Sequence, residues 1–381
     1  MATQINKKVI IIAVALLILL LIGAYVFYIL FYRQTTSSET GNDQNNGSTI
    51  VIKPGLTNGP IPLSREKVLA PTIDSSGKKI GYYSKNQGNM YEVNFDGSNL
   101  SRISGANLAG LLQILWSPNK EKIVGVFQEN NATTKYLHDY QNGTSIRLNE
   151  KIEQVTWSPI DDRIAIQSFN PDANNNVISI ANADGTNLKN VFQTRIKDLV
   201  LDWPMADKIS ARTKTSGLSE GLLITINPDS GVFNDVLQDI YGLNARWFPF
   251  GDKILYSATN SEGKNIKLFT ADQNGQDVKN TELSTLVEKC AFSQDNRVLF
   301  CAIPQHLSEN AVWPDDYYKG LVTTKDSFWK INLDTGQKTQ IFNSGTSAQS
   351  YDAIDPFLSP QENYLFFVNK KDGLLYGLKI E

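Results

Sequence analysis

The sequence LWSPNKEKIVGVF at residues 115–127 decides the fold, together with a close copy, VTWSPIDDRIAIQSF, at residues 155–169. Each copy is an apolar segment ending in Trp, then a Ser-Pro turn with polar residues, then a second apolar segment. Proline lacks an amide hydrogen, so it suits the end of a strand and not its centre. Both copies therefore predict a β-hairpin of two buried strands.

The hairpin recurs along the chain. Its anchor residues are Ile73, Trp116, Trp157, Trp203, Trp247, Phe292 and Leu358, spaced 43, 41, 46, 44, 45 and 66 apart. After each hairpin comes a shorter apolar run with a tight turn, such as Asp96-Gly97 or Asp184-Gly185, where Gly supplies the positive φ. A period near 45 is typical of a four-stranded propeller blade. We expect an all-β, seven-bladed propeller; six or eight blades stay open because the first anchor is weak.

The last repeat lacks a fourth strand, because the chain stops after Leu374–Ile380 supplies the third. By spacing, Ile61-Pro62-Leu63 occupies the place of that missing strand. We therefore expect the two ends of residues 61–381 to share one blade, which would remove an exposed sheet edge.

These repeats resemble the WD-type propeller repeats of TolB-like bacterial proteins. The resemblance rests on the Trp-Ser-Pro turns at 116–118 and 157–159, on their variants in the later repeats, and on the Asp-Gly turns. It covers roughly residues 65–381. It implies a propeller outside the cytoplasm that binds other proteins. TolB-like proteins are usually soluble, and the N-terminal segment described next departs from that pattern.

Residues 9–32 form a stretch of 24 residues without a charge, long enough at about 1.5 Å per residue to exceed the roughly 30 Å hydrocarbon core of a bilayer. A cleaved signal peptide is the alternative, but its apolar region would be shorter and would precede a small-residue cleavage site. Lys7 and Lys8 precede the stretch and only Arg33 follows it closely. The positive-inside rule then predicts a single-pass membrane protein with residues 1–8 in the cytoplasm.

Residues 33–60 are rich in Ser, Thr, Asn and Gly, a composition that favours a flexible linker. The predicted order is therefore a cytoplasmic start at 1–8, a transmembrane helix at 9–32 in contact with lipid, a linker at 33–60, and an extracytoplasmic propeller at 61–381.

Composition excludes several classes of protein. The net charge is −3 and no basic block is present, which argues against nucleic-acid binding. The chain has two Cys and two His, too few for a cysteine-based metal site, so no metal and no cofactor is expected.

The two cysteines flank a short hairpin with Asp295 and Asn296 at its tip. Pairing the strands symmetrically about this tip places Cys290 opposite Cys301, where cross-strand Cα atoms are within disulfide range. A disulfide is expected, with two buried free thiols as the alternative, because a slip of one residue would destroy the geometry.

An insertion at residues 303–325 explains the long last spacing and is the best candidate for a binding site. It joins the second and third strands of the sixth blade, on the face where the innermost strands begin. It mixes aromatic and charged residues in the manner of a binding surface. The candidate residues are Trp313, Asp315, Asp316, Tyr317, Tyr318 and Lys319. In the alternative, the aromatic side chains fold back and plug the channel.

Two further motifs are better explained as loops. Gly217–Gly221 fits the G-x-S-x-G pattern of hydrolases, but it lies between two strands and not between a strand and a helix. Asp172, Asn174 and Asn176 alternate like calcium ligands, but the loop lacks the Gly and the terminal Glu of such sites.

The sequence therefore predicts no catalytic residue and no enzyme. The leading hypothesis is a membrane-tethered extracytoplasmic scaffold that binds a protein partner of the cell envelope. The alternatives are a propeller enzyme acting on a carbohydrate or small molecule over the channel, which needs clustered carboxylates or histidines, and a structural spacer.

Overall fold

The computed structural model of the protein describes residues 59–105, 108–346 and 349–380. The predicted cytoplasmic start and transmembrane helix, and all but the end of the predicted linker, lie outside these residues. Within the described ranges, no helix is long and apolar enough to cross a membrane.

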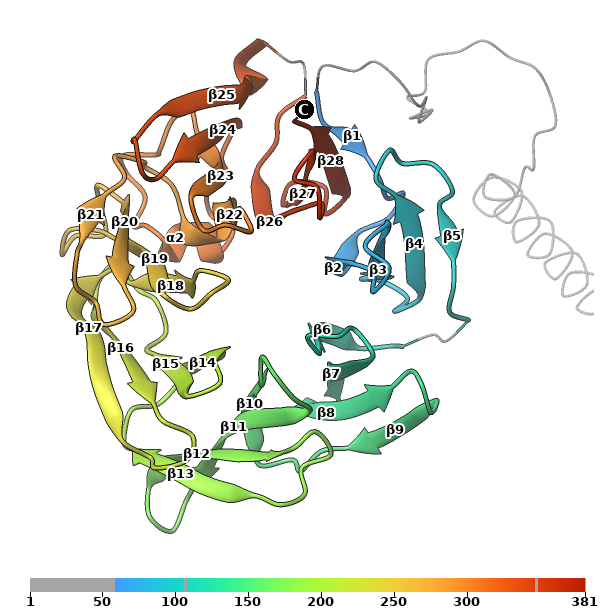
Figure 1. Ribbon diagram of the computed structural model, residues 1–381, viewed down its shortest axis with the longest axis vertical. Coiled ribbons are helices and arrows are strands. Elements are labelled where there is room, and N and C mark those ends of the chain that lie inside the picture. The colour runs from blue at the N-terminus through green and yellow to red at the C-terminus, as the bar shows by residue number, and fades with distance from the viewer. Residues whose placement is uncertain (1–58, 106–107, 347–348, 381) are drawn as a thin grey trace, which may run out of the picture. The chain divides into compact units, whose positions relative to one another are not determined.

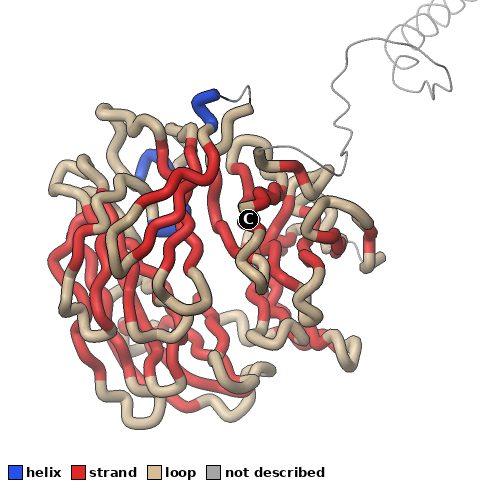
Figure 2. Tube along the Cα trace, turned by 45° about the horizontal axis from the view of Figure 1, so that its top comes forward, coloured by secondary structure: helices blue, strands red, loops and turns tan. Residues whose placement is uncertain are grey.

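Seven antiparallel sheets of four strands each follow one another around a ring (Figure 1). This arrangement confirms the prediction of an all-β propeller with seven blades. The strands form the wall of the ring, and most of the loops gather at its two ends (Figure 2).

The first four blades follow the chain in order, from innermost to outermost strand. Blade 1 has β2 (Val68–Ile73), β3 (Lys79–Ser84), β4 (Met90–Asn94) and β5 (Ser101–Arg102). Blade 2 has β6 (Leu111–Trp116), β7 (Lys122–Glu129), β8 (Ala132–Asp139) and β9 (Thr144–Arg147). Blade 3 has β10 (Ile152–Trp157), β11 (Arg163–Asn170), β12 (Asn175–Asn182) and β13 (Lys189–Thr194). Blade 4 has β14 (Val200–Met205), β15 (Lys208–Arg212), β16 (Glu220–Ile226) and β17 (Phe233–Tyr241).

The last three blades carry the short helices. Blade 5 has β18 (Asn244–Trp247), β19 (Lys253–Ala258), β20 (Lys267–Asp272) and β21 (Lys279–Asn280). Blade 6 has η2 (Val287–Lys289), β22 (Cys290–Phe292), β23 (Val298–Pro304), α2 (Asp315–Tyr318), β24 (Asp326–Asn332) and β25 (Lys338–Phe342). Blade 7 has β26 (Ala353–Leu358), β27 (Tyr364–Asn369), β28 (Leu375–Lys379) and, from the other end of the propeller, β1 (Ile61–Pro62); η3 (Ser344–Thr346) precedes β26.

Strand β1 closes the ring as the spacing predicted. Ile61 pairs with Gly377 and Pro62 with Tyr376, so β1 is the fourth strand of blade 7. The Leu63 amide adds a hydrogen bond of 2.8 Å to the Leu375 carbonyl. The first and last strands of the propeller are therefore joined in the sheet of blade 7.

Where the repeated turn has a serine, as in blades 2, 6 and 7, its hydroxyl stabilises the hairpin by a hydrogen bond to the backbone. The Ser117 hydroxyl accepts from the Lys122 amide at 2.9 Å, and Ser293 accepts from the Val298 amide at 2.9 Å. This bond satisfies a backbone N–H group where the hydrogen bonds between the two strands end. A short hydroxyl side chain therefore suits this position.

Three of the four tryptophan anchors donate a hydrogen bond to the preceding blade, while the buried Trp203 indole N–H has no partner among the described residues. The Trp116 indole donates to the Ala70 carbonyl at 2.9 Å, and Trp157 donates to the Leu115 carbonyl at 3.0 Å. Trp247 donates to the Ser210 hydroxyl in blade 4 at 3.0 Å. These side chains also fill the apolar layers between blades, so their role is structural, as expected.

Cys290 and Cys301 form a disulfide, with Cα atoms 4.1 Å apart. The strand register has the predicted pairs, Cys290 with Cys301 and Phe292 with Leu299. Both cysteines are fully buried in the apolar layer between blades 5 and 6. The bond therefore crosslinks the first two strands of blade 6.

Candidate functional site

The insertion lies on the face where the second strand of each blade turns into the third, and we refer to this face as the insertion face. Two of its aromatic side chains are buried: Trp313 and Tyr317 belong to one apolar cluster with Ile266, Leu286 and Ala311. The two side chains therefore fold back onto the propeller, as in the second of the two arrangements considered from the sequence.

Loops of blades 4 and 5 hold one side of the insertion. The Asp315 carboxylate accepts hydrogen bonds from the Ser216 hydroxyl at 2.9 Å and from the Gly217 amide at 2.7 Å. The Trp313 amide donates to the Gly263 carbonyl at 2.7 Å, and the Lys264 ammonium donates to the Ala311 carbonyl at 2.7 Å. Gly217–Gly221, the hydrolase-like motif, is thus a loop that receives the insertion and then enters β16.

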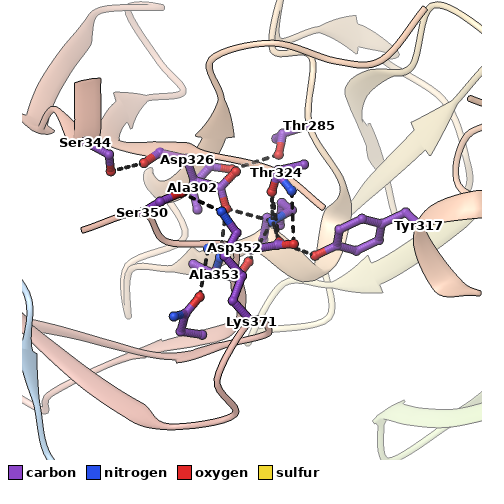
Figure 3. Close-up of polar contacts among 12 residues, drawn as sticks. Thr285, Ala302, Tyr317, Thr324, Asp326, Ser344, Ser350, Asp352, Ala353 and Lys371 are labelled. Atoms are coloured by element: carbon purple, nitrogen blue, oxygen red, sulfur yellow. Dashed lines mark hydrogen bonds and ion pairs between the residues drawn. The ribbon is translucent and has the colours of Figure 1, made fainter. Parts of the chain in front are cut away.

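A buried ionic network holds the other side (Figure 3). The Tyr317 hydroxyl donates to Asp352 at 2.6 Å, and Thr324 donates to the same oxygen at 2.8 Å. The Lys289 ammonium lies 2.7 Å from both Asp326 and Asp352, and all three charged side chains are fully buried. The network joins the insertion to η2, β24 and the start of β26.

Lys289 decides the protonation of this network. Burial by itself would raise the pKa of Asp352, but the Lys289 ammonium and the donors from Tyr317 and Thr324 hold that pKa below its ordinary value. Burial raises the pKa of Asp326, and Lys289 opposes this effect. Asp352 is therefore the ionised partner of Lys289, and its charge fixes the Tyr317 hydroxyl.

Tyr318 and Lys319 are the two predicted binding residues that remain exposed to solvent. Asp315 and Asp316 are half-buried, and both carboxylates accept hydrogen bonds from the protein; Asp316 accepts from the Val312 amide at 2.8 Å. The insertion is therefore held rigidly on the propeller. Of the six residues predicted from the sequence, only Tyr318 and Lys319 lie on its outer surface.

A set of charged residues on the inner strands lies next to Tyr318, and we refer to it as the channel cluster. Its members come from blades 4 to 7: Asp202, Arg212, Asn244, Arg246, Glu288, Tyr318 and Asp355. The Asn244 amide donates to Glu288 at 3.0 Å and to the Tyr318 hydroxyl at 3.0 Å. One amide thus joins the insertion to the wall of the channel.

The three carboxyls of the channel cluster all have a pKa above the ordinary carboxyl value. Burial raises the pKa of Asp202 and of Asp355, and Arg246 opposes the effect at both. Burial also raises the pKa of Glu288, and the charge of Asp355 adds to that shift. Solvent nevertheless reaches Asp202 and Asp355. Carboxyl groups that are surrounded by protein and still reached by water are expected along the channel of a propeller. Ionisable groups with shifted pKa values in such places often mark functional sites.

A hollow of about 280 Å³ opens beside these residues, lined by Asp202, Arg212, Asn244, Arg246 and Glu288 among others. The Arg212 guanidinium donates to the Thr215 hydroxyl and the Arg246 guanidinium to the Cys290 carbonyl. Glu288 Oε1 is buried and has no hydrogen-bond partner among the described residues. The hollow therefore offers two cations and an unused acceptor to a polar ligand.

Within the described residues, no group of three His, Cys, Asp or Glu side chains could hold a metal ion. In the Asn-rich loop, the Asn176 amide donates to the Ile196 carbonyl at 2.7 Å, so this side chain is used by the fold.

Sequence reasoning missed the channel cluster. Its residues lie on six separate elements, and no two of the carboxyls are close in sequence. The sequence offered one indication of the cluster. Asp202 in LDWPMADKISA is a charged residue on a strand that is expected to be innermost and mainly apolar. Aligning the repeats by their Trp anchors could have revealed it.

Comparisons with known proteins concern the fold. No family model and no curated protein matches the sequence. Solved structures do match. Oligogalacturonate lyase in complex with manganese has a TM-score of 0.60 at 11% identity, over 84% of this chain and 93% of the other, and the same enzyme from Vibrio parahaemolyticus has 0.59 at 10%, with the same shares.

Two further structures are propellers. The propeller domain of the Trilobed protease from Pyrococcus furiosus has a TM-score of 0.54 at 12% identity, over 83% of this chain and 96% of the other. TolB from Acinetobacter baumannii has a TM-score of 0.47 at 15% identity, over 77% and 66%. With the seven blades, the match to the Trilobed protease propeller confirms the predicted resemblance as one of propeller fold.

The expectation that the chain is not an enzyme is overturned. It treated this propeller as a binding scaffold, whereas the structures of oligogalacturonate lyase place the same fold in an enzyme. The physical reason for the error is that the criterion for an enzyme was clustered carboxylates near the channel. That cluster exists at Asp202, Glu288 and Asp355, and the sequence did not reveal it.

Proposed function

We propose that this chain is a membrane-tethered propeller outside the cytoplasm that binds a protein partner of the cell envelope on its insertion face. The observation that carries the proposal is the rigid attachment of the insertion to blades 4, 5 and 7. A surface that is already ordered loses little entropy on binding.

The exposed side chains of this surface suit a protein partner. Leu321 is 71% exposed and Leu218 is 59% exposed, and both adjoin the contact between Gly217 and Asp315. Tyr318 is 44% exposed and lies at the charged hollow. Tyrosine and arginine are enriched in binding hot spots, and the two exposed leucines add apolar contact area beside them.

Photo-crosslinking in intact cells tests the proposal. A photoreactive amino acid is placed at residue 319 of the full chain, and captured proteins are identified by mass spectrometry. Leu321→Asp and Leu218→Asp should each reduce capture about tenfold or more, because they place a charge in the contact. Ile160→Asp is the matched control, since Ile160 is 66% exposed in the first turn of blade 3, on the opposite face. Equal capture by all three variants would overturn the proposal.

The membrane tether and the location need a test of their own. The full chain should remain in the membrane fraction after an alkaline wash, and a chain that begins at residue 59 should be released. External protease added to cells without an outer barrier should digest the propeller and leave residues 1–8 protected. Release of the full chain by the wash would contradict the tether.

The second candidate is an enzyme acting on an acidic carbohydrate in the channel. Glu288 favours this candidate, because a carboxyl with a raised pKa is suited to proton transfer and its Oε1 is unused. Arg212 and Arg246 would hold a carboxylate-bearing substrate in the hollow. The lyase structures with the same fold act, by name, on oligogalacturonate.

Incubation of the purified full chain with galacturonate oligomers tests the second candidate. A lyase would form an unsaturated product that absorbs in the ultraviolet. Glu288→Gln should abolish this product while Leu321→Asp leaves it unchanged. No product at any pH between 4 and 9, with the oligomers intact by mass spectrometry, would exclude this substrate class.

A further inference from the structure

A second hollow lies on the outer part of blade 6. Its volume is about 640 Å³, within the usual range for small-ligand sites. The walls come from the end of β23, from β24 and β25, and from the connection between β21 and η2. They include Ile303, Gln305, Ser327, Trp329 and Gln340. The channel cluster does not contribute to it, and the insertion contributes only its first residues, 303–305.

Strand pairing places an indole at the centre of this hollow. Trp329 in β24 is paired with Cys301 on one side and with Gln340 on the other. Ser327 is two residues earlier on β24 and therefore shares a face of the sheet with Trp329. The Trp329 side chain is half-buried, and its indole N–H has no hydrogen-bond partner in the described ranges. Four other blades carry Trp at the anchor position of the innermost strand, whereas Trp329 lies on a third strand and packs with part of its ring against the apolar layer between blades 5 and 6.

Amide and hydroxyl groups surround the indole. The Gln305 amide donates to the Ser327 hydroxyl at 3.1 Å and to the Asn343 carbonyl oxygen at 3.3 Å. Gln340 is exposed beside Trp329. These groups both donate and accept hydrogen bonds, and they carry no charge.

The charges of the hollow cancel. Lys338 and Glu282 form an ion pair of 3.2 Å across its edge. An acidic ligand would gain no free cation there, in contrast to the arginines of the channel. A ligand with many hydroxyl groups and an apolar face would use the amides and the indole together.

We propose that this hollow binds a neutral carbohydrate chain. The C–H face of a sugar ring packs on the Trp329 indole, and the hydroxyl groups of that ring bind Gln305 and Gln340, while Ser327 holds the Gln305 amide in place. An aromatic ring contributes large contact area at low entropy cost, while polar side chains around it fix the orientation of the ligand. The proposal is independent of the partner at the insertion face and of any reaction in the channel.

Binding of neutral oligosaccharides to the purified full chain tests the proposal. The probes are oligomers of glucose, of N-acetylglucosamine and of mannose, and binding is measured by calorimetry and by tryptophan fluorescence. We expect at least one class to bind, with an affinity that falls about tenfold or more in Trp329→Ala. Gln340→Ala should also weaken binding, and this variant guards against a folding defect because Gln340 is exposed.

The controls separate this site from the other two. Glu288→Gln and Leu321→Asp should bind the same oligosaccharide with unchanged affinity. The absence of binding to all three classes by the folded protein would overturn the proposal. Binding that survives both Trp329→Ala and Gln340→Ala unchanged would also overturn it, because the carbohydrate would then occupy another place.

Discussion

The Gly217 amide donates a 2.7 Å hydrogen bond to the carboxylate of Asp315, a residue 98 positions further along the chain. The bond joins a loop of blade 4 to the insertion of blade 6. Gly217 is required for this contact, because a Cβ atom there would lie 2.0 Å from the Trp313 carbonyl oxygen and 2.8 Å from the Gly263 Cα.

Substitution of Gly217 should therefore displace the insertion. We expect Gly217→Ala to lower the free energy of unfolding by about 1–3 kcal/mol, the usual effect of overpacking, and to reduce partner capture. Gly105→Ala is the matched control, since nothing lies within 4 Å of a Cβ at that exposed position. Urea denaturation of both variants measures the difference, and a Gly217→Ala variant as stable as Gly105→Ala would contradict this account of the contact.

Removal of the buried cation should be more damaging. Lys289→Met leaves Asp326 and Asp352 buried without their partner, which costs about 3–5 kcal/mol of stability. Lys79→Met removes the exposed pair between Lys79 and Glu92 and should cost at most about 1 kcal/mol. Chemical denaturation provides both values, and a similar small loss in the two variants would show that the network contributes little.

The channel carboxyls predict a pH dependence of stability. Their pKa values are raised in the folded protein, so between the ordinary carboxyl pKa and the raised value the folded state binds more protons than the unfolded chain. The free energy of unfolding from this source therefore falls as pH rises through that window. Glu288→Gln stays neutral, so it should lose less stability than the wild type as pH rises above the ordinary carboxyl pKa of about 4.

Thermal denaturation across this range measures the effect, with Glu309→Gln on the exposed surface of the insertion as control. The control should follow the wild type. A Glu288→Gln curve that runs parallel to the wild type would mean that Glu288 is ionised in both states.

The state of the Cys290–Cys301 disulfide in cells tests the predicted location outside the cytoplasm. In protein taken from intact cells, Cys290 and Cys301 should resist alkylation unless a reductant and a denaturant are both present, because both are fully buried. Replacement of both by Ser should cost about 2–3 kcal/mol by the loop-entropy model for a separation of 11 residues. Alkylation under denaturing conditions without reductant would show free thiols and argue against an oxidising compartment.

Much of the fold could be predicted because blade structure is encoded within short distances along the chain. A strand alternation, a Ser-Pro turn and a Trp anchor lie within about a dozen residues, and the pleat then determines which residues pair. Strand pairing about a short turn predicted Cys290 opposite Cys301, and the spacing of the repeat predicted Ile61-Pro62 beside the last strand. The candidate binding residues were less well predicted, since four of the six are buried or used by the fold.

The sequence by itself determined the repeat, the propeller class and the pairing of neighbouring strands, since these follow from turn chemistry and from side-chain periodicity. The structure decided that the blades number seven and not six or eight. Only the tertiary structure decided that Trp313 and Tyr317 point inward, that Gly217 receives Asp315, and that Asp202, Glu288 and Asp355 share a channel. The physical reason is that ring closure brings together positions from different blades, and their burial and pKa values depend on these neighbours and not on the residues adjacent in sequence.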